Sequence, residues 1–299
     1  MKVLMSGSTG LIGSALVKAL AAHGDTVARL VRPPAAGFAP ELVWDPAAGR
    51  LNPACFEGAD AVIHLSGENI ASGRWTRARM ERLRGSRVDS TRLLSETVAG
   101  LGHPPGVFVC ASAVGFYGHR GDEVLDETSA AGIGFLPEVC EAWEGATNAA
   151  KDAGVRVVNL RFGGVFASEG GLLGKMLPLF RWGLGGIVGN GGQYMSWVTL
   201  EDAVSAALHA MSGESIEGPV NVVAPEPVTN RTFTKALGRA LRRPTAFRVP
   251  AAAVRVAFGP MADEVLLASQ RVVPGRLTES GFSFSAPDVD RAFRAMFGN

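Results

Sequence analysis

Short runs of apolar and β-branched residues alternate, through the first half of the chain, with longer stretches in which apolar residues recur every three or four positions. The short runs predict buried strands, at residues 2–5, 26–31, 61–65, 107–110 and 155–160. The longer stretches predict helices, the clearest being the stripe of Leu11, Leu16 and Leu20. Because strand and helix alternate repeatedly, the pattern predicts an α/β fold with a Rossmann-like, doubly wound parallel sheet.

The pattern changes after Arg161, where pairs of glycines surround a short apolar segment over residues 172–182. Two further strands, at 196–199 and 220–223, are predicted to return to the sheet, with a helix over 200–211 between them. Prolines then divide the chain into short elements. We therefore predict a sheet domain and a smaller C-terminal α/β cap domain, made of residues 1–165 with 195–224 and of residues 166–194 with 225–299.

The composition excludes some classes of function without naming one. The chain has 299 residues, 47% of them apolar, and a formal net charge of +1, so it offers no overall field for nucleic acid or an anionic membrane. Its three cysteines form no CxxC pair, which is typical of a reducing compartment. The apolar run at the N-terminus is too short for a signal peptide or a membrane span, so we expect a cytoplasmic protein.

Basic residues are frequent between Arg74 and Arg92, on several faces of a predicted helix with few aromatic neighbours. We interpret them as a solvated helix face and expect no nucleic-acid partner. The histidines show no metal-ligand spacing, so no metal site is expected. The expected partner is a small-molecule substrate, and a homodimer is compatible with the sequence.

A glycine loop between the first predicted strand and the first predicted helix is the strongest motif, and it reads Gly7-Ser8-Thr9-Gly10-Leu11-Ile12-Gly13. Gly7 permits a tight turn, Gly10 lets backbone N–H groups approach a pyrophosphate, and Gly13 lets the helix pack against the sheet. Strand, loop and amphipathic helix in this order predict dinucleotide binding.

The end of the second strand bears on the choice of dinucleotide. An NAD site usually has an aspartate or glutamate there, whereas this chain has Arg32, with Arg29 nearby. A cation suits a 2′-phosphate, so NADP(H) is the expected cofactor; the alternative is that Arg32 is only a solvated charge. Leu65, Ser66 and Gly67 close a later strand and are expected to lie beside the adenosine half.

Further motifs follow in a recognisable order along the chain, namely Val62-Ile63-His64-Leu65-Ser66-Gly67, Ser112-Ala113-Val114-Gly115-Phe116-Tyr117-Gly118, Trp143-Glu144, Leu160-Arg161, Gln193-Tyr194-Met195-Ser196-Trp197 and Pro274-Gly275-Arg276-Leu277. With the glycine loop, they resemble the extended short-chain dehydrogenase/reductases. Closer still is the "epimerase family protein" branch of the epimerase/dehydratase-like proteins, which carries a C-terminal domain of unknown function. The resemblance covers essentially the whole chain and implies a cofactor contact for Arg161.

The acid/base pair of that superfamily, Tyr-x-x-x-Lys, is absent. The only tyrosines are Tyr117 and Tyr194, which are followed four positions later by glycine and valine. Alignment on Glu144 places Leu136 in the tyrosine position and Cys140 in the lysine position. Sugar-nucleotide epimerases would have an arginine in place of Met195 and an asparagine in place of Gly164, so two ligands of a nucleotide diphosphate are missing.

Five residues remain as candidates for chemistry. Ser112 and Tyr117 end a strand that normally faces the nicotinamide. Either would donate a hydrogen bond to a substrate carbonyl, and Tyr117 could instead act as a displaced acid/base; the alternative for both is packing and turn formation, with the hydroxyl of Tyr117 bonded to the backbone. Gln193, Ser196 and Trp197 follow a glycine loop and are predicted to contact substrate, or else to anchor the cap.

Three functions remain open. The leading hypothesis is an NADP(H)-dependent oxidoreductase acting on a small carbonyl or enone, with proximity replacing part of the missing acid/base catalysis. The second is a noncatalytic NADP(H)-binding regulator, which would tolerate the loss of the pair. The third, a nucleotide-sugar epimerase or dehydratase, needs a strong base that the sequence does not supply.

Overall fold

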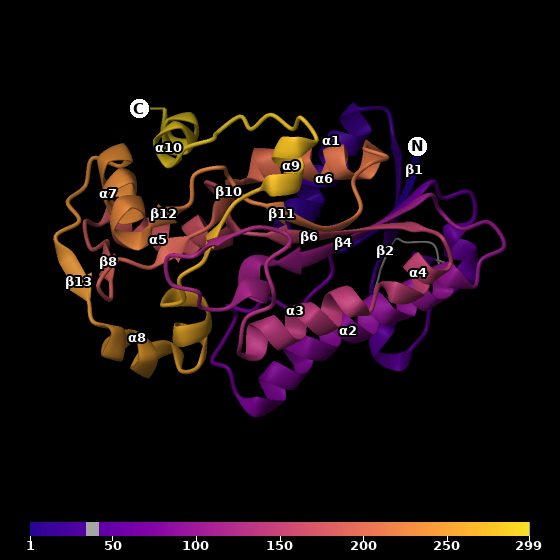
Figure 1. Ribbon diagram of the computed structural model, residues 1–299, viewed down its shortest axis with the longest axis horizontal. Helices are drawn as coiled ribbons and strands as arrows, with labels where there is room; N and C mark the ends of the chain where they lie inside the picture. The colour runs from indigo at the N-terminus through magenta and orange to yellow at the C-terminus, as the bar shows by residue number, and fades with distance from the viewer. Residues whose placement is uncertain (34–41, 299) are drawn as a thin grey trace. The chain divides into compact units, whose positions relative to one another are not determined.

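A six-stranded parallel sheet is the central element of the computed structural model, which describes residues 1–33 and 42–298 (Figure 1). Its strands are β1 (Lys2–Ser6), β2 (Thr26–Leu30), β3 (Ala61–His64), β4 (Val107–Ala113), β6 (Arg156–Phe162) and β11 (Gly218–Val222). Their order is β11-β6-β4-β3-β1-β2, with β1 between β2 and β3. The predicted doubly wound sheet is confirmed, because the strand order turns back on either side of the first strand.

Ten α-helices are found among the described residues: α1 (Leu11–Ala22), α2 (Arg77–Ala99), α3 (Phe135–Gly145), α4 (Asn148–Asp152), α5 (Gly171–Arg181), α6 (Leu200–Ser212), α7 (Asn230–Ala240), α8 (Ala251–Phe258), α9 (Gly275–Glu279) and α10 (Val289–Phe297). Single-turn helices are η2 (Pro46–Ala48), η3 (Pro53–Phe56), η4 (Val114–Tyr117) and the π-helical η5 (Ala262–Leu266). None of these helices is long and apolar enough to cross a bilayer.

Short two-stranded ladders lie outside the central sheet, together with isolated bridges of Val31 with Val43 and of Asp45 with Arg50. Their strands are β5 (Val124–Leu125), β7 (Gly164–Phe166), β8 (Gly186–Val188), β9 (Tyr194–Met195), β10 (Trp197–Thr199), β12 (Val228–Thr229), β13 (Phe247–Val249) and β14 (Arg271–Val272). The pairs are β10 with β7, β12 with β9, β13 with β8 and β14 with β5. The prediction that both late strands return to the central sheet is therefore correct for β11 and wrong for β10, which pairs with β7 instead.

The chain divides into two compact units. The first contains Met1–Ser112, Val139–Leu160 and Ala207–Pro219, and the second contains Ala113–Glu138, Arg161–Ala206 and Val220–Asn299. These boundaries differ from the predicted ones chiefly because the segments that follow β4 and β6 pack with the later part of the chain. Tyr117, for example, bonds to both Arg161 and Asn221 within the second unit.

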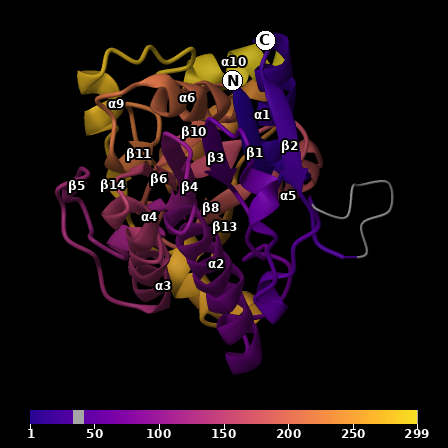
Figure 2. The ribbon, with the colours of Figure 1, turned by 90° about the vertical axis from the view of Figure 1, so that its right-hand side faces the viewer.

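The first unit buries the stripe that predicted its first helix. Val3, Leu4 and Met5 of β1 have no exposed area, and α1 buries Leu16 and Leu20 completely. Figure 2 shows α1 beside β1 and β2. The apolar period of 3.6 residues thus sets which face of α1 meets the sheet.

His64 lies at the end of β3 with no exposed area, between two serines of the same unit. Its Nδ1 lies 2.6 Å from Ser6 Oγ and its Nε2 lies 3.1 Å from Ser90 Oγ. Burial lowers the pKa of His64 from 6.5 to about 3, because the charged ring would lose its hydration. The folded state therefore holds a neutral imidazole.

We expect this burial to make the protein less stable in mild acid. Between the unfolded pKa near 6.5 and the folded pKa of about 3, the unfolded state binds the extra proton, so stability falls as the pH drops. The slope from this group is about 1.4 kcal/mol per pH unit. Urea unfolding at pH 7.5 and 5.5 measures it, with His64→Gln as the control that cannot titrate. An equal fall in both proteins would contradict this origin.

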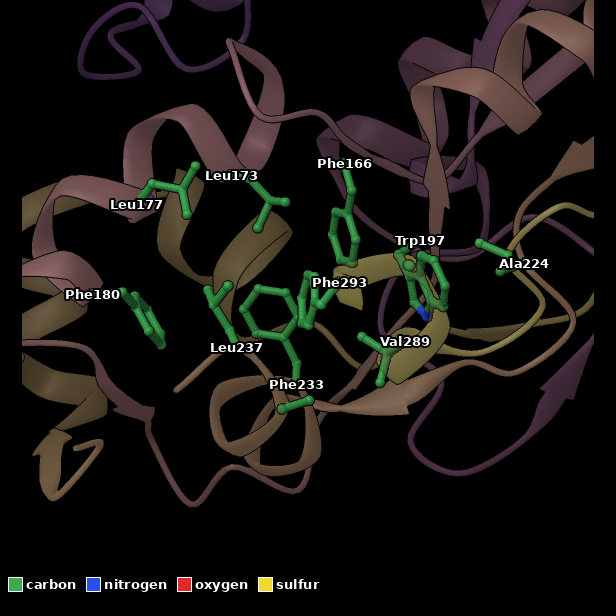
Figure 3. Close-up of a cluster of buried hydrophobic side chains, with 13 residues drawn as sticks. Phe166, Leu173, Leu177, Phe180, Trp197, Ala224, Phe233, Leu237, Val289 and Phe293 are labelled. Carbon is green, nitrogen blue, oxygen red and sulfur yellow. The ribbon is translucent and has the colours of Figure 1, made fainter. Parts of the chain in front are cut away.

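The second unit has a large aromatic core (Figure 3). Phe166 stacks on Trp197 with ring centroids 5.1 Å apart, and Phe233 and Phe293 pack beside it. α5, α7 and α10 contribute the surrounding aliphatic and aromatic side chains of this cluster. The unit therefore has a hydrophobic core of its own, assembled from segments far apart in the sequence.

Candidate functional site

The glycine loop joins β1 to α1 in the first unit, and two of its glycines are dictated by contacts within the protein. Gly7 has a φ of +74°, and a methyl group placed on it would come within 2.6 Å of the Leu65 carbonyl carbon. A methyl group on Gly13 would come within 2.1 Å of the Gly7 carbonyl oxygen. No other residue fits at either position without displacing backbone. The same contact brings Leu65 and Ser66 beside the loop, and their predicted place beside the adenosine half of the cofactor stays a prediction.

The N-terminus of α1 offers backbone donors to an anion. Gly10 is the N-cap and has no side chain to accept the first N–H groups of the helix, and the first turn has no acidic residue. A methyl group on Gly10 would be no closer than 3.4 Å to other protein atoms. The unsatisfied N–H groups of a helix start carry a partial positive charge that suits a pyrophosphate. The loop residues from Gly7 to Gly13 therefore fit the phosphate groups of a dinucleotide.

Arg32 follows β2 and is exposed, and it forms no hydrogen bond or ion pair with another residue of the described ranges. Residues 34–41, which come directly after it, lie outside those ranges. Arg29, in β2, is half-buried. The exposed guanidinium of Arg32 is available to an anionic ligand, and its predicted role at a 2′-phosphate stays a prediction.

The segment after β3 is fixed by arginines that the sequence analysis placed on a solvated helix face. Arg79 is only 9% exposed and donates hydrogen bonds to Glu68 Oε1, Asn69 O and Ser72 Oγ. Arg87 donates to Glu68 O, and its guanidinium lies 5.2 Å from the centre of the Trp143 ring. The solvated interpretation is wrong for these two residues, because they shape the loop that contains Gly67. No periodic signal marked them, since the polar residues of α2 occupy most of its circumference.

A serine and a glutamate meet at the carboxyl end of β4 in the first unit. Ser112 is 3% exposed and donates a hydrogen bond to Glu144 Oε1 over 2.6 Å. Glu144 lies on α3 and is half-buried. In doubly wound sheets, ligands bind beyond the carboxyl ends of the strands. This hydroxyl and carboxylate, separated by 32 positions, are a polar pair in the place where the fold puts chemistry.

Tyr117 lies on η4 in the second unit, and its side chain has no exposed area. Its hydroxyl lies 2.9 Å from Asp126 O and 2.8 Å from Asn221 Oδ1 as donor, and it accepts from Arg161 Nη1 at 2.9 Å. Burial raises the pKa of Tyr117 and outweighs the opposing effect of Arg161. A buried, weakly acidic hydroxyl with three protein partners does not support the predicted acid/base role. The alternative, packing with the hydroxyl bonded to backbone, describes it.

Arg161 is 3% exposed and belongs to the same cluster. Besides its bond to Tyr117, its guanidinium carbon lies 3.5 Å from the centre of the Phe116 ring. Stacking on an aromatic face compensates part of the lost hydration of a buried guanidinium. These contacts give Arg161 a role inside the second unit, and its predicted cofactor contact stays a prediction.

The three residues predicted to contact substrate are buried in the second unit. Gln193 Nε2 donates to Val188 O and Leu266 O, and Ser196 Oγ donates to Gln270 O. Trp197 is 1% exposed and donates from its indole nitrogen to Glu226 O. Because their polar atoms bond to backbone, these contacts support the alternative that the residues anchor the unit, and the predicted substrate contact stays a prediction.

Two glutamates of the second unit form hydrogen bonds that the sequence did not predict. Glu127 is 8% exposed and accepts hydrogen bonds from the backbone of Asn221 and Arg276. A methyl group on Gly275 would come within 2.8 Å of its Oε2, which explains the glycine of the Pro274-Gly275-Arg276-Leu277 motif. Glu264, on η5, accepts from the backbone N–H groups of Phe135 and Leu136 at the start of α3. No local sequence pattern could have marked these two glutamates, because each carboxylate accepts a hydrogen bond from a backbone N–H group more than ninety positions away.

Comparison with known proteins decides the family. The family model described as the NAD dependent epimerase/dehydratase family matches residues 3–223, and a domain of unknown function matches residues 249–296. The chain belongs to the NAD-dependent epimerase/dehydratase family. An epimerase family protein of Mycobacterium leprae is 48% identical over 290 residues, which cover 97% of this chain and 94% of that protein. The human epimerase family protein SDR39U1 is 34% identical over 297 residues, which cover 98% and 99%.

Solved structures of other epimerase/dehydratase family proteins share the fold. The crystal structure of human epimerase family protein SDR39U1 (isoform 2) with NADPH has a TM-score of 0.91 and 33% identity, with full coverage of both chains. UDP-glucose 4-epimerase of Thermotoga maritima, in complex with UDP-glucose, has a TM-score of 0.76 at 18% identity and covers 100% of this chain and 98% of its own. At that identity the second likeness supports the fold alone. The predicted family and fold are confirmed.

Proposed function

We propose that this family member binds NADP(H) at the loop from Gly7 to Gly13 and acts as an oxidoreductase on a small carbonyl compound. The cofactor assignment rests on the start of α1. Backbone N–H groups there are available as donors, and the glycines of the loop leave room for phosphate oxygens. The NADPH in the crystal structure of the human relative supports the same choice. Arg32, exposed at the end of β2, supports NADP(H) over NAD(H).

When bound, the nicotinamide supplies or accepts a hydride, and the protein supplies orientation and a proton. Ser112 is the group we assign to the proton. Its hydroxyl donates a hydrogen bond to Glu144 over 2.6 Å, so this carboxylate fixes the orientation of the serine. The carbonyl oxygen takes its proton from the Ser112 hydroxyl, and water returns a proton to the serine oxygen, because Glu144 accepts in this bond and is not the proton source. The pair takes the place of the Tyr-x-x-x-Lys pair, which the sequence lacks.

A titration with NADPH and NADH tests the cofactor assignment. Arg32→Ala is expected to weaken NADPH binding about tenfold, because a charged hydrogen bond of about 1.5 kcal/mol to the 2′-phosphate is lost. NADH has no 2′-phosphate, so its affinity should stay the same and is the internal control. Fluorescence of the reduced nicotinamide gives both dissociation constants. Equal losses for the two dinucleotides would show that Arg32 does not read the 2′-phosphate.

A panel of aldehydes, ketones and enones then tests the reaction, with oxidation of bound NADPH as the signal. Turnover of any member supports the oxidoreductase. Tight NADPH binding without turnover on the whole panel would favour the second candidate, a noncatalytic NADP(H)-binding regulator. The burial of Tyr117 and the absence of the Tyr-x-x-x-Lys pair are the observations that keep this candidate open.

A further inference from the structure

Positive charge is concentrated in one part of the second unit, in a protein whose formal net charge is only +1. The sequence from Asn230 to Ala262 contains no aspartate or glutamate. Its cationic residues are Arg231, Lys235, Arg239, Arg242, Arg243, Arg248 and Arg255. This run covers α7, β13 and α8, which Figure 1 shows in succession in orange and gold.

Four of these cations line one hollow. It has a volume of about 480 Å³ and is bordered by Lys235, Arg239, Arg242 and Arg243, with Thr245 adding a hydroxyl. Lys235 and Arg239 are one helical turn apart on α7, and Arg242 and Arg243 come directly after the end of this helix. The volume lies within the range of small-ligand sites, which is about 300–1,000 Å³.

The acidic residue facing these cations is Asp290 of α10. Arg239 Nη2 lies 2.7 Å from Asp290 Oδ1, in a pair whose side chains are both more than half exposed. Arg243 uses its Nε on the Arg181 carbonyl oxygen, at 2.8 Å. The side chain of Lys235 forms no hydrogen bond or ion pair with the residues that the structure describes. Arg239 is thus paired and Arg243 is bonded to backbone, whereas the ammonium group of Lys235 is available to an anion.

Arg242 follows the C-cap of α7 with a φ of +53°, and among the described residues it is the only non-glycine with a positive φ. Glycine is the usual residue at this left-handed position, because a side chain there costs about 1 kcal/mol. The chain therefore holds a long cation at the edge of the hollow in a backbone conformation that glycine would adopt with less strain.

We propose that this hollow binds a chain of phosphate groups, as in an inorganic polyphosphate or a nucleoside triphosphate. Guanidinium groups match phosphate oxygens in geometry and charge, and several of them match several phosphates. Two of the three other cations of the run are engaged elsewhere: Arg231 bonds to Asn190 O and Arg255 pairs with Asp263. Because four cations gather around one hollow, they suit a compact anion better than a nucleic acid, which would need a long basic track.

Isothermal titration with inorganic tripolyphosphate at low salt tests the proposal on the full chain. The variant Lys235→Gln/Arg242→Gly is expected to bind at least about tenfold more weakly, because two charged contacts are lost. The matched control is Arg77→Gln/Arg84→Gln, which removes two exposed charges from α2 in the first unit and should bind like the wild type. Arg242→Gly also relieves the left-handed strain, so its melting temperature should not fall.

ATP in place of tripolyphosphate separates the two sources of a phosphate chain. Equal affinity for ATP and tripolyphosphate identifies an inorganic polyphosphate as the ligand. Tighter binding of ATP identifies a nucleotide if Trp182→Ala reduces it, since Trp182 is 82% exposed and follows Arg181. Equal tripolyphosphate affinity in the wild type and the hollow variant would overturn the site, as would an equal loss in the control. Tighter binding of single-stranded oligothymidylate through Lys235 and Arg242 would overturn it in favour of nucleic acid.

Discussion

Replacement of Trp197 by alanine is expected to lower the free energy of unfolding by about 3–5 kcal/mol, the largest loss that we anticipate for a single side chain of this protein. The ring is 1% exposed, stacks on Phe166 and donates a hydrogen bond to Glu226 O. Its removal would leave a cavity in the aromatic core of the second unit and an unsatisfied carbonyl oxygen.

Trp182 provides the matched control, because it is a tryptophan of the same unit that is 82% exposed. Trp182→Ala should change stability by no more than about 0.5 kcal/mol. Urea unfolding monitored by circular dichroism measures both variants. If Trp197→Ala were as stable as Trp182→Ala and lost activity instead, the original assignment of Trp197 to substrate contact would regain its support.

Ser112→Ala is expected to reduce carbonyl turnover about a hundredfold while leaving the NADPH dissociation constant unchanged. General acid catalysis contributes about 10²–10⁴-fold to the rate in enzymes. We expect the loss in the alanine variant to lie at the lower end of this range, because water can donate the proton in place of the missing hydroxyl. The prediction depends on the hydroxyl that Glu144 orients across 2.6 Å. It is measured as kcat and KM on a carbonyl that the wild type reduces.

Ser112→Thr keeps a hydroxyl on the same carbon and should restore most of the turnover. If the role of Ser112 were purely structural, turnover would not depend on the presence of this hydroxyl. A Ser112→Ala protein with wild-type kcat would remove Ser112 from the mechanism. A parallel rise in the NADPH dissociation constant would instead place its effect on cofactor binding.

The loop from Gly7 to Gly13 was predictable because everything that defines it is local. A strand, three glycines at fixed spacing and an apolar stripe lie within the first 22 residues. The contact of Gly7 with Leu65 could also be expected, because β1 and β3 are parallel neighbours and their ends meet at the same edge of the sheet.

Burial and pairing of polar side chains could not be predicted in the same way. Serine, tyrosine and tryptophan in a family motif suggested chemistry, yet in the structure Tyr117 and Trp197 have their polar atoms bonded inside the second unit. Arg79 and Arg87 looked like surface charges, whereas Arg79 is buried and Arg87 is half-buried. Conversely, nothing local linked Ser112 to Glu144, since 32 positions separate them.

The sequence by itself determined the parallel α/β fold, the position of the dinucleotide loop and the membership of the family, because periodicity, glycine spacing and motif order are properties of the chain read in one direction. The tertiary structure alone decided which polar groups bond to other protein groups and which stay exposed. That outcome depends on backbone N–H and carbonyl groups brought together from distant segments, and every residue type has the same backbone groups. In the folded protein, Glu127, Gln193 and Ser196 form hydrogen bonds with backbone groups of the second unit. Arg32 stays exposed, and four cations lie around one hollow.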